Sequence, residues 1–262
     1  MATRLITLTT DFGLTDHFAG VMKGVILSLC PAARIVDICH EVSAYQIAEG
    51  GFTIAQAYRF FPPKTVHVIV VDPGVGTARR PLLTEAAGQF FVAPDNGVLS
   101  MIYSGEKHKV RAVTASRYFL GNVSRTFHGR DVFAPVAAHL ANGVAPSRFG
   151  KPVTDYLRLD FDTPVRTGKR VWTGAVLKVD HFGNLITNFR PENFPQVRAG
   201  RFVMAAGMER IGRLAQNYAE CAPGELFLIE GSSGFLEISL SQASAAKRLG
   251  CASGSPLELT VY

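Results

Sequence analysis

The chain has 262 residues, of which 47% are hydrophobic and 18% charged, with a formal net charge of +6. This length holds one large domain or two modest ones, and the composition excludes an intrinsically disordered protein. No apolar run approaches the roughly 20 residues that span a bilayer, which excludes a helical membrane protein.

The first 150 residues alternate predicted strands and helices. We expect strands at residues 5–9, 34–39, 66–71 and 89–93, and helices at residues 17–30, 43–60 with Ser43 as the N-cap, and 131–142. Residues 66–71 are almost all β-branched, which indicates a central strand buried on both faces. The alternation predicts an α/β domain with a doubly wound, mostly parallel sheet.

The character of the sequence changes after residue 150. Residues 151–168 contain two prolines and mixed charges and are interpreted as a linker. Residues 169–262 predict a smaller β-rich domain, for which we expect a barrel, with one helix at residues 241–249. Its strands are expected at residues 170–179, 184–188, 201–205, 225–230, 235–240 and 257–262.

The cysteines and the N-terminus predict the compartment. Residues 1–4 and the run after them lack the apolar core of a signal peptide. With no export signal and no paired spacing, the cysteines are interpreted as reduced thiols, which favours a cytoplasmic protein. They are Cys30, Cys39, Cys221 and Cys251.

Three aspartates follow hydrophobic runs in the first domain. Asp11, Asp72 and Asp95 each stand beside a glycine, proline or asparagine, or close to one, where a predicted strand ends. Ligands of an open parallel sheet bind at the carboxyl ends of its strands, so the three predict a shared site. A turn or N-cap role is the alternative for any one of them.

The loop from Asp72 to Arg79 matches no known phosphate motif. Gly74-Val75-Gly76 begins a G-x-G-x-x-G frame, but its last position is Arg79, and no G-K-[ST] follows. The glycines therefore allow close approach of the backbone to a ligand, or only make the turn. Asp72 and Arg79 can face each other across this loop.

Other reaction types find little support. No H-E-x-x-H motif or Cys/His cluster predicts a metal site, and Gly231-Ser232-Ser233-Gly234 lacks the spacing of a serine nucleophile elbow. His128 precedes a predicted helix and can be structural. Asp180-His181-Phe182-Gly183-Asn184 fits a hairpin turn, or a site for a purine and an amine. The positive charge allows nucleic-acid binding, but the basic residues are scattered.

Six motifs in order resemble the S-adenosyl-L-methionine (SAM) hydrolase family, also called SAM hydroxide adenosyltransferases, which is related to the SAM-dependent fluorinase and chlorinase. The resemblance covers essentially the whole chain. The motifs are Thr10-Asp11-Phe12-Gly13, the segment from Val71 to Arg80, Pro94-Asp95-Asn96-Gly97, the segment from Phe127 to Asp131, the segment from Asp180 to Asn184, and Gly231-Ser232-Ser233-Gly234.

The resemblance implies an α/β domain followed by a β-barrel domain, and a homotrimer that holds SAM between neighbouring subunits. The implied reaction is hydrolysis of SAM to adenosine and L-methionine, a nucleophilic substitution with no cofactor and no metal. Asp72, Arg79 and His128 are the implied water-activating set. The implied substrate-binding residues are Asp11 at the ribose diol, Tyr45 at an aromatic wall, Asp180 and Ser232 at the methionine end, Asn184 at the adenine, and also Val75, Gly129 and Gln242.

The sequence departs from the halogenating relatives in three places. They carry a tyrosine at the position of Asp72, a threonine-rich loop at Gly74-Val75-Gly76 and, in the fluorinase, an arginine at the position of Ser233. The fluorinase also has an extra loop that this chain lacks. An anionic Asp72 repels a halide, so we expect water as the nucleophile. A neutral thioether leaves, so the reaction needs no general acid, only a positioned and activated water.

Three alternatives stay open from the sequence alone. One is a halide-dependent SAM adenosyltransferase, the second is a non-catalytic adenosine- or SAM-binding protein, and the third is a nucleic-acid-binding protein.

Overall fold

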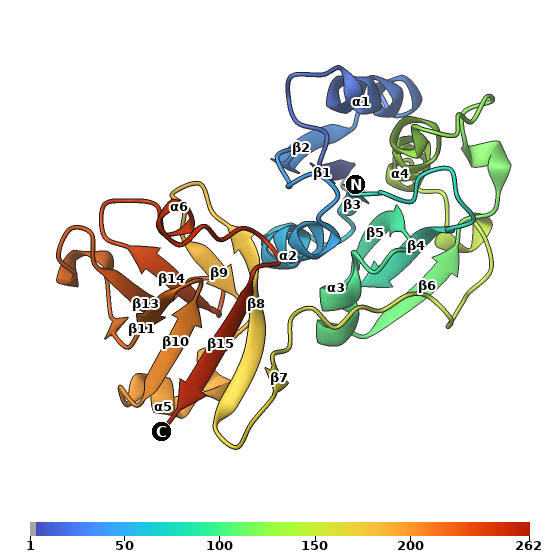
Figure 1. The fold of residues 1–262 in the computed structure, drawn as a ribbon. Coiled ribbons are helices and arrows are strands. Elements are labelled where there is room, and N and C mark those ends of the chain that lie inside the picture. The colour runs from blue at the N-terminus through green and yellow to red at the C-terminus, as the bar shows by residue number, and fades with distance from the viewer. Residues whose placement is uncertain (1–3) are drawn as a thin grey trace. The chain divides into compact units, whose positions relative to one another are not determined.

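The computed structural model describes residues 4–262 and divides the chain into two compact units (Figure 1). One unit ends at Leu159 and the other spans Asp160–Tyr262. Residues 1–3, which belong to the predicted first domain, lie outside the described residues. Within residues 4–262, no helix is long and apolar enough to cross a membrane.

The first unit is built on a six-stranded sheet in the order β2-β1-β3-β5-β4-β6. The neighbours β2, β1, β3 and β5 run parallel, and β4 runs antiparallel to both β5 and β6. The predicted mostly parallel α/β sheet is therefore confirmed. The strands are β1 (Leu5–Thr10), β2 (Arg34–Cys39), β3 (Val66–Val70), β4 (Pro81–Ala86), β5 (Gln89–Pro94) and β6 (His108–Ala112).

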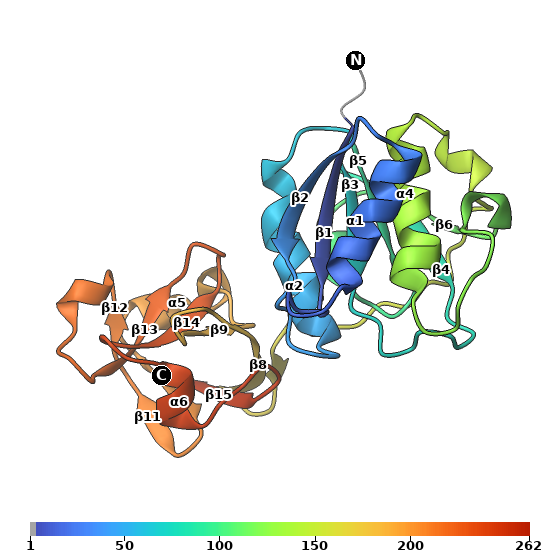
Figure 2. The ribbon, with the colours of Figure 1, turned by 90° about the horizontal axis from the view of Figure 1, so that it is seen from above.

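Helices cover both faces of this sheet. Figure 2 shows α1 and α4 side by side on one face, where they pack on Ile6, Leu8 and Val68. The helices α2 and α3 contribute to a second hydrophobic core. Its strand residues, such as Ile69 and Phe91, point to the other face of the sheet. Central strands are thus apolar on both faces, as the β-branched run predicted. The helices are α1 (Phe18–Leu29), α2 (Ile47–Ala57), α3 (Ser100–Gly105) and α4 (Ala134–Ala141), with 3-10 turns at Tyr58–Phe60, Ser116–Tyr118 and Pro146–Arg148.

Two helix starts differ from the prediction. The helix expected to begin after Ser43 begins at Ile47, and Ser43 is not its N-cap. The backbone of Tyr45 is left-handed, with φ of +67°, which interrupts any helix before that point. The helix expected from Asp131 starts with a π-helical turn, Gly129–Phe133, which leads into α4.

The second unit is a curled half-barrel sheet of nine strands, in the order β11-β10-β15-β8-β9-β14-β13-β12 with β7 beside β8. All pairs are antiparallel except β12 with β13. The predicted β-rich fold is confirmed. The strands are β7 (Val165–Arg166), β8 (Val171–Val179), β9 (Leu185–Thr187), β10 (Phe202–Ala206), β11 (Glu209–Ile211), β12 (Leu214–Ala215), β13 (Leu226–Glu230), β14 (Leu236–Leu240) and β15 (Pro256–Val261).

The helices of the second unit are short. They are α5 (Pro195–Arg198) and α6 (Ala245–Leu249), with 3-10 turns at Pro191–Asn193 and Tyr218–Glu220. The helix predicted from residue 241 starts at Ala245, because the Ser244 side chain accepts a hydrogen bond from the Lys247 N–H and caps it. Gly250, left-handed at φ +62°, ends it.

Candidate active site

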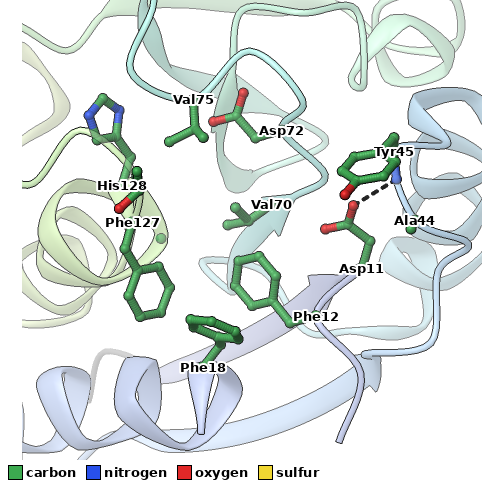
Figure 3. Close-up of a pocket in the computed structure, with 12 residues that line it drawn as sticks. Asp11, Phe12, Phe18, Ala44, Tyr45, Val70, Asp72, Val75, Phe127 and His128 are labelled. Atoms are coloured by element: carbon green, nitrogen blue, oxygen red, sulfur yellow. Dashed lines mark hydrogen bonds between the residues drawn. The ribbon is translucent and has the colours of Figure 1, made fainter. Parts of the chain in front are cut away.

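A cavity of about 280 Å³ opens in the first unit beside the ends of β1 and β3. Asp11 follows β1 and Asp72 follows β3, and Figure 3 shows both carboxylates at this cavity. Strand ends of a parallel sheet meet at one edge, which explains why residues 61 positions apart line the same space. The lining consists of Asp11, Phe12, Phe18, Ala44, Tyr45, Val70, Asp72, Val75, Thr126, Phe127, His128 and Gly129.

Arg79 joins Asp72 to His128. Its Nε donates to Asp72 Oδ1 at 3.0 Å, and one terminal nitrogen, Nη2, contacts both Asp72 Oδ2 and His128 Nδ1, the latter at 2.8 Å. The side chains of Asp72 and Arg79 are only 3% and 7% exposed. A planar guanidinium that binds a carboxylate through two nitrogens fixes its orientation. Of the three residues predicted as the reaction set, Arg79 therefore contacts both of the others.

This contact also sets the protonation state of His128. A guanidinium only donates hydrogen bonds, so His128 Nδ1 accepts, and a neutral ring carries its proton on Nε2. Burial lowers the pKa of His128, and the positive charge of Arg79 lowers it further. Both effects favour the neutral imidazole near pH 7. The other terminal nitrogen of Arg79, Nη1, is buried with no hydrogen-bond partner among the described residues.

Asp11 and Tyr45 face each other on the opposite side of the cavity. The Tyr45 backbone N–H donates to Asp11 Oδ2 at 2.9 Å (Figure 3). The pKa of Asp11 lies above its ordinary value, because burial raises it by more than the hydrogen bond from the Tyr45 N–H lowers it. Tyr45 is 71% exposed, and its backbone is left-handed, a strained conformation for this residue that is often found at ligand sites.

An aromatic cluster that the sequence did not predict forms the floor of the cavity. Phe12, Phe18 and Phe127 contact one another, with ring centroids 5.2 to 5.7 Å apart (Figure 3). Phe12 and Phe127 stand inside the motifs around Asp11 and His128, which is a signal that could have identified them. Apolar rings at this position exclude water from one side of the space above them.

The two glycines of the Asp72 loop have different structural requirements. Gly76 has φ of +77°, and a Cβ atom there would lie 2.2 Å from the backbone oxygen of Arg125. Gly74 is outside the left-handed region, and the nearest atom to a Cβ would be 3.5 Å away. Gly76 therefore lets the Asp72 loop pack against the segment that leads to His128.

Replacing Gly76 with alanine is expected to lower both activity and stability, because the added carbon forces the Arg125 backbone away and displaces His128. Strain of this kind costs about 1–3 kcal/mol. Gly74→Ala is the matched control and should stay within about 0.5 kcal/mol of the parent. Thermal unfolding and turnover of both variants test this, and equal behaviour of the two would contradict it.

Asp95 does not join the site, and the prediction of three aspartates around one ligand is wrong for this residue. It is absent from the lining of the cavity. Its carboxylate accepts hydrogen bonds from Arg80 at 2.7 and 3.0 Å and from the Leu157 N–H at 2.8 Å. The neighbouring arginines Arg79 and Arg80 thus pair with different aspartates.

Two of the predicted residues of the second unit, Asp180 and Asn184, contact each other. Asp180 Oδ1 accepts from the backbone N–H groups of Phe182 and Asn184, and Oδ2 accepts from the Asn184 side-chain amide at 2.8 Å. Asp180 therefore organises the turn between β8 and β9. Gln242, in the segment after β14, is left-handed at φ +58°.

A buried carboxylate that the sequence did not predict lies near Asp180. Glu237 in β14 is 7% exposed, and burial raises its pKa, with a further contribution from the charge of Asp180. A Cβ atom on Gly231, which precedes Ser232, would lie 1.8 Å from Glu237 Oε1. The feature of the sequence that could have identified Glu237 is that it is an acidic residue inside the otherwise mostly apolar strand β14.

Within residues 4–262, no group of three His, Cys, Asp or Glu side chains is arranged to hold a metal ion. The ionisable groups of His, Asp and Glu type that line the cavity are the carboxylates of Asp11 and Asp72 and the His128 ring.

Two family models match this chain. Residues 6–150 match the SAM hydroxide adenosyltransferase N-terminal domain, and residues 174–258 match the C-terminal domain of the same family. A (R)-S-adenosyl-L-methionine hydrolase from Salinispora tropica is 36% identical over 97% of each chain. A fluorinase from Actinoplanes sp. is 28% identical over 75% of each chain. A crystal structure of an uncharacterized conserved protein from Thermotoga maritima has a TM-score of 0.86, at 35% identity, and covers 97% of this chain and 99% of that chain.

Proposed function

Since this chain belongs to the SAM hydroxide adenosyltransferase family and is related to the fluorinases, we propose that it hydrolyses SAM to adenosine and L-methionine. The protein is an enzyme of the SAM hydrolase class, with full-length relatives of that activity. The observation that supports the proposal most is the contact of Asp72, Arg79 and His128 beside a cavity.

The charge around the cavity suits a sulfonium substrate. Two carboxylates, Asp11 and Asp72, line it, and no lysine or arginine is among its lining residues. Negative side chains favour a cationic sulfonium over a halide. Arg79 does not line the cavity itself but contacts Asp72 and His128, which do. We propose that Asp11 binds the ribose diol and that Tyr45, Val75 and Gly129 form the walls around the reacting carbon.

The proposed chemistry is one substitution. The oxygen of a bound water attacks C5′ in line with the C5′–S bond, and the bonding pair leaves with sulfur to give the neutral thioether of methionine. Asp72 accepts the proton of the water, Arg79 fixes the Asp72 carboxylate, and His128 donates a hydrogen bond from Nε2 to the attacking oxygen without giving up its proton. A positioned proton transfer of this kind accelerates a reaction by about 10²–10⁴-fold.

The remaining substrate contacts are proposed for the second unit. Asp180 and Ser232 would bind the methionine end, and Asn184 and Gln242 the adenine. We propose a homotrimer whose neighbouring subunits complete each site, which sedimentation of the purified protein tests. The four cysteines are free thiols, which suits a reducing compartment such as the cytoplasm.

Hydrolysis in water enriched in ¹⁸O is expected to place one ¹⁸O atom in adenosine and none in methionine, because the water oxygen becomes the 5′-hydroxyl. Mass spectrometry of both products measures this. A parallel reaction with added chloride or fluoride is the control for halide transfer, and 5′-halogenated adenosine there would contradict water as the nucleophile. Tight adenosine binding with no turnover would contradict the proposed activity and indicate a non-catalytic nucleoside-binding protein.

A further inference from the structure

A chain of polar side chains lies directly behind the Asp11 turn. Lys23 Nζ contacts Asp37 Oδ2 at 2.5 Å, and Asp37 Oδ1 lies 3.0 Å from His40 Nε2. His40 Nδ1 lies 2.8 Å from the hydroxyl of Thr10, and this hydroxyl accepts from the Phe12 N–H at 3.3 Å. The chain thus runs from the charged surface of α1 and β2 to the residues on each side of Asp11.

The middle of this chain is removed from water. His40 is 4% exposed and Thr10 is 0% exposed, whereas the side chains of Lys23 and Asp37 are about one third exposed, at 33% and 39%. His40 Nε2 is buried and has no hydrogen-bond partner of good geometry among the described residues, so its 3.0 Å approach to the Asp37 carboxylate is an electrostatic contact. The hydrogen bond of the His40 side chain is the one between Nδ1 and the Thr10 hydroxyl, and the Thr10 oxygen also accepts from the Phe12 N–H.

His40 also holds the turn through its backbone. The Gly13 N–H donates to the His40 oxygen at 2.7 Å, and the Val42 N–H donates to the Thr10 oxygen at 3.3 Å. The segment after His40 leads to Tyr45, whose N–H binds Asp11. The side chain and the backbone of His40 therefore constrain the Asp11 turn before and after the aspartate.

We propose that His40, oriented by Asp37, is a positioning residue that sets the direction of the Asp11 carboxylate toward the ribose diol. This rests on the proposed role of Asp11. An apolar residue could fill a buried position without the need to satisfy polar groups. A polar chain that ends on both sides of Asp11 is better explained by the orientation that it imposes.

The test compares the binding of adenosine with that of 2′,3′-dideoxyadenosine, which lacks the diol. The parent should prefer adenosine, and Asp11→Asn should lose this preference. His40→Gln keeps an amide near Asp37 but loses the bond to Thr10, so the preference should fall roughly tenfold, the effect of one good hydrogen bond. His40→Asn, with an amide at the Nδ1 position, should retain more of it.

A matched control exists in the same strand. Thr7 Oγ1 lies 2.7 Å from Nδ1 of another buried histidine, His67, and neither residue lines the cavity. Thr10→Val should lower the preference for the diol, and Thr7→Val should leave it unchanged. Thr10→Val also tests the proposal if the His40 variants do not fold.

The outcomes separate the two proposals. If Asp11→Asn keeps the preference, the proposed role of Asp11 fails, and the role of His40 fails with it, whereas the ¹⁸O result stands independently. If Asp11→Asn loses the preference but Thr10→Val and His40→Gln keep it, only the positioning role is overturned. If His40→Gln and Thr10→Val weaken the binding of both nucleosides equally, the role of His40 is merely structural, and the proposal is also overturned.

Discussion

Asp72→Asn is expected to lower kcat by at least about 10²-fold while adenosine still binds. The variant loses the proton acceptor of the proposed reaction, and such a group is typically worth about 10²–10⁴-fold. The amide NH₂ of the asparagine would also face the N–H groups of Arg79, so two donors would oppose each other. Water cannot relieve this, because the side chains of Asp72 and Arg79 are only 3% and 7% exposed. Steady-state turnover of SAM and calorimetric titration with adenosine measure the two effects.

The effect of losing an ion pair must be distinguished from the effect of losing the proton acceptor. Asp95→Asn is the matched control, because Asp95 is paired with Arg80 at 2.7 Å at the end of the adjacent strand but does not line the cavity. It should reduce stability and leave kcat unchanged.

The double variant Asp72→Ala with Arg79→Ala provides a second separation. Removal of one partner of a buried pair costs about 3–5 kcal/mol, and removal of both costs less. The double variant should therefore be more stable than Asp72→Ala and equally inactive. Recovery of turnover in the double variant, or an active Asp72→Asn, would refute the assignment of Asp72.

The protein is expected to lose about 3 kcal/mol of folding free energy through His67 as the pH falls from 6.5 to 4. Burial lowers the pKa of His67 to about 4, against an ordinary value of 6.5, and the ring is 0% exposed. The unfolded chain therefore takes up a proton before the folded chain does. Stability from the neutral ring is complete above pH 6.5 and is lost between pH 6.5 and 4.

Denaturant unfolding at several pH values between 4 and 7 measures this loss. Carboxylates titrate in the same range, so the informative quantity is the difference between the parent and His67→Gln. The glutamine variant keeps an amide for Thr7 and for Gln89, which lie 2.7 and 3.2 Å from the His67 nitrogens. It should be less sensitive to acid than the parent. Identical pH profiles would contradict a buried neutral His67.

The elements that the sequence predicted well have one dominant signal. The helix α1 has apolar residues at helical spacing and a proline after its end, and β3 is a β-branched run, so local pattern and tertiary burial agree. The strands β4 and β6 were missed. The first starts with Pro81 after two arginines, and the second, with the sequence HKVRA, mixes charges into an edge strand.

The errors at the site come from long-range partners. Ser43 has the chemistry of an N-cap. However, Tyr45 donates a hydrogen bond to Asp11, 34 residues away, and has a left-handed backbone, so α2 begins only after it. Asp95 has the same local setting as Asp72, yet Arg80 and the backbone of Leu157 engage it. Spacing along the chain does not tell which of two adjacent arginines pairs with which aspartate.

The conformation of Tyr45 has a consequence for protein engineering. A left-handed backbone costs a tyrosine roughly 1–2 kcal/mol that a glycine does not incur. Selection for heat resistance alone is therefore expected to favour Tyr45→Gly, which relieves this strain where the gain exceeds the added chain entropy of glycine, and which deletes an aromatic wall of the cavity. Selection at this position has to score survival on heating and product formation together, because the two select opposite residues.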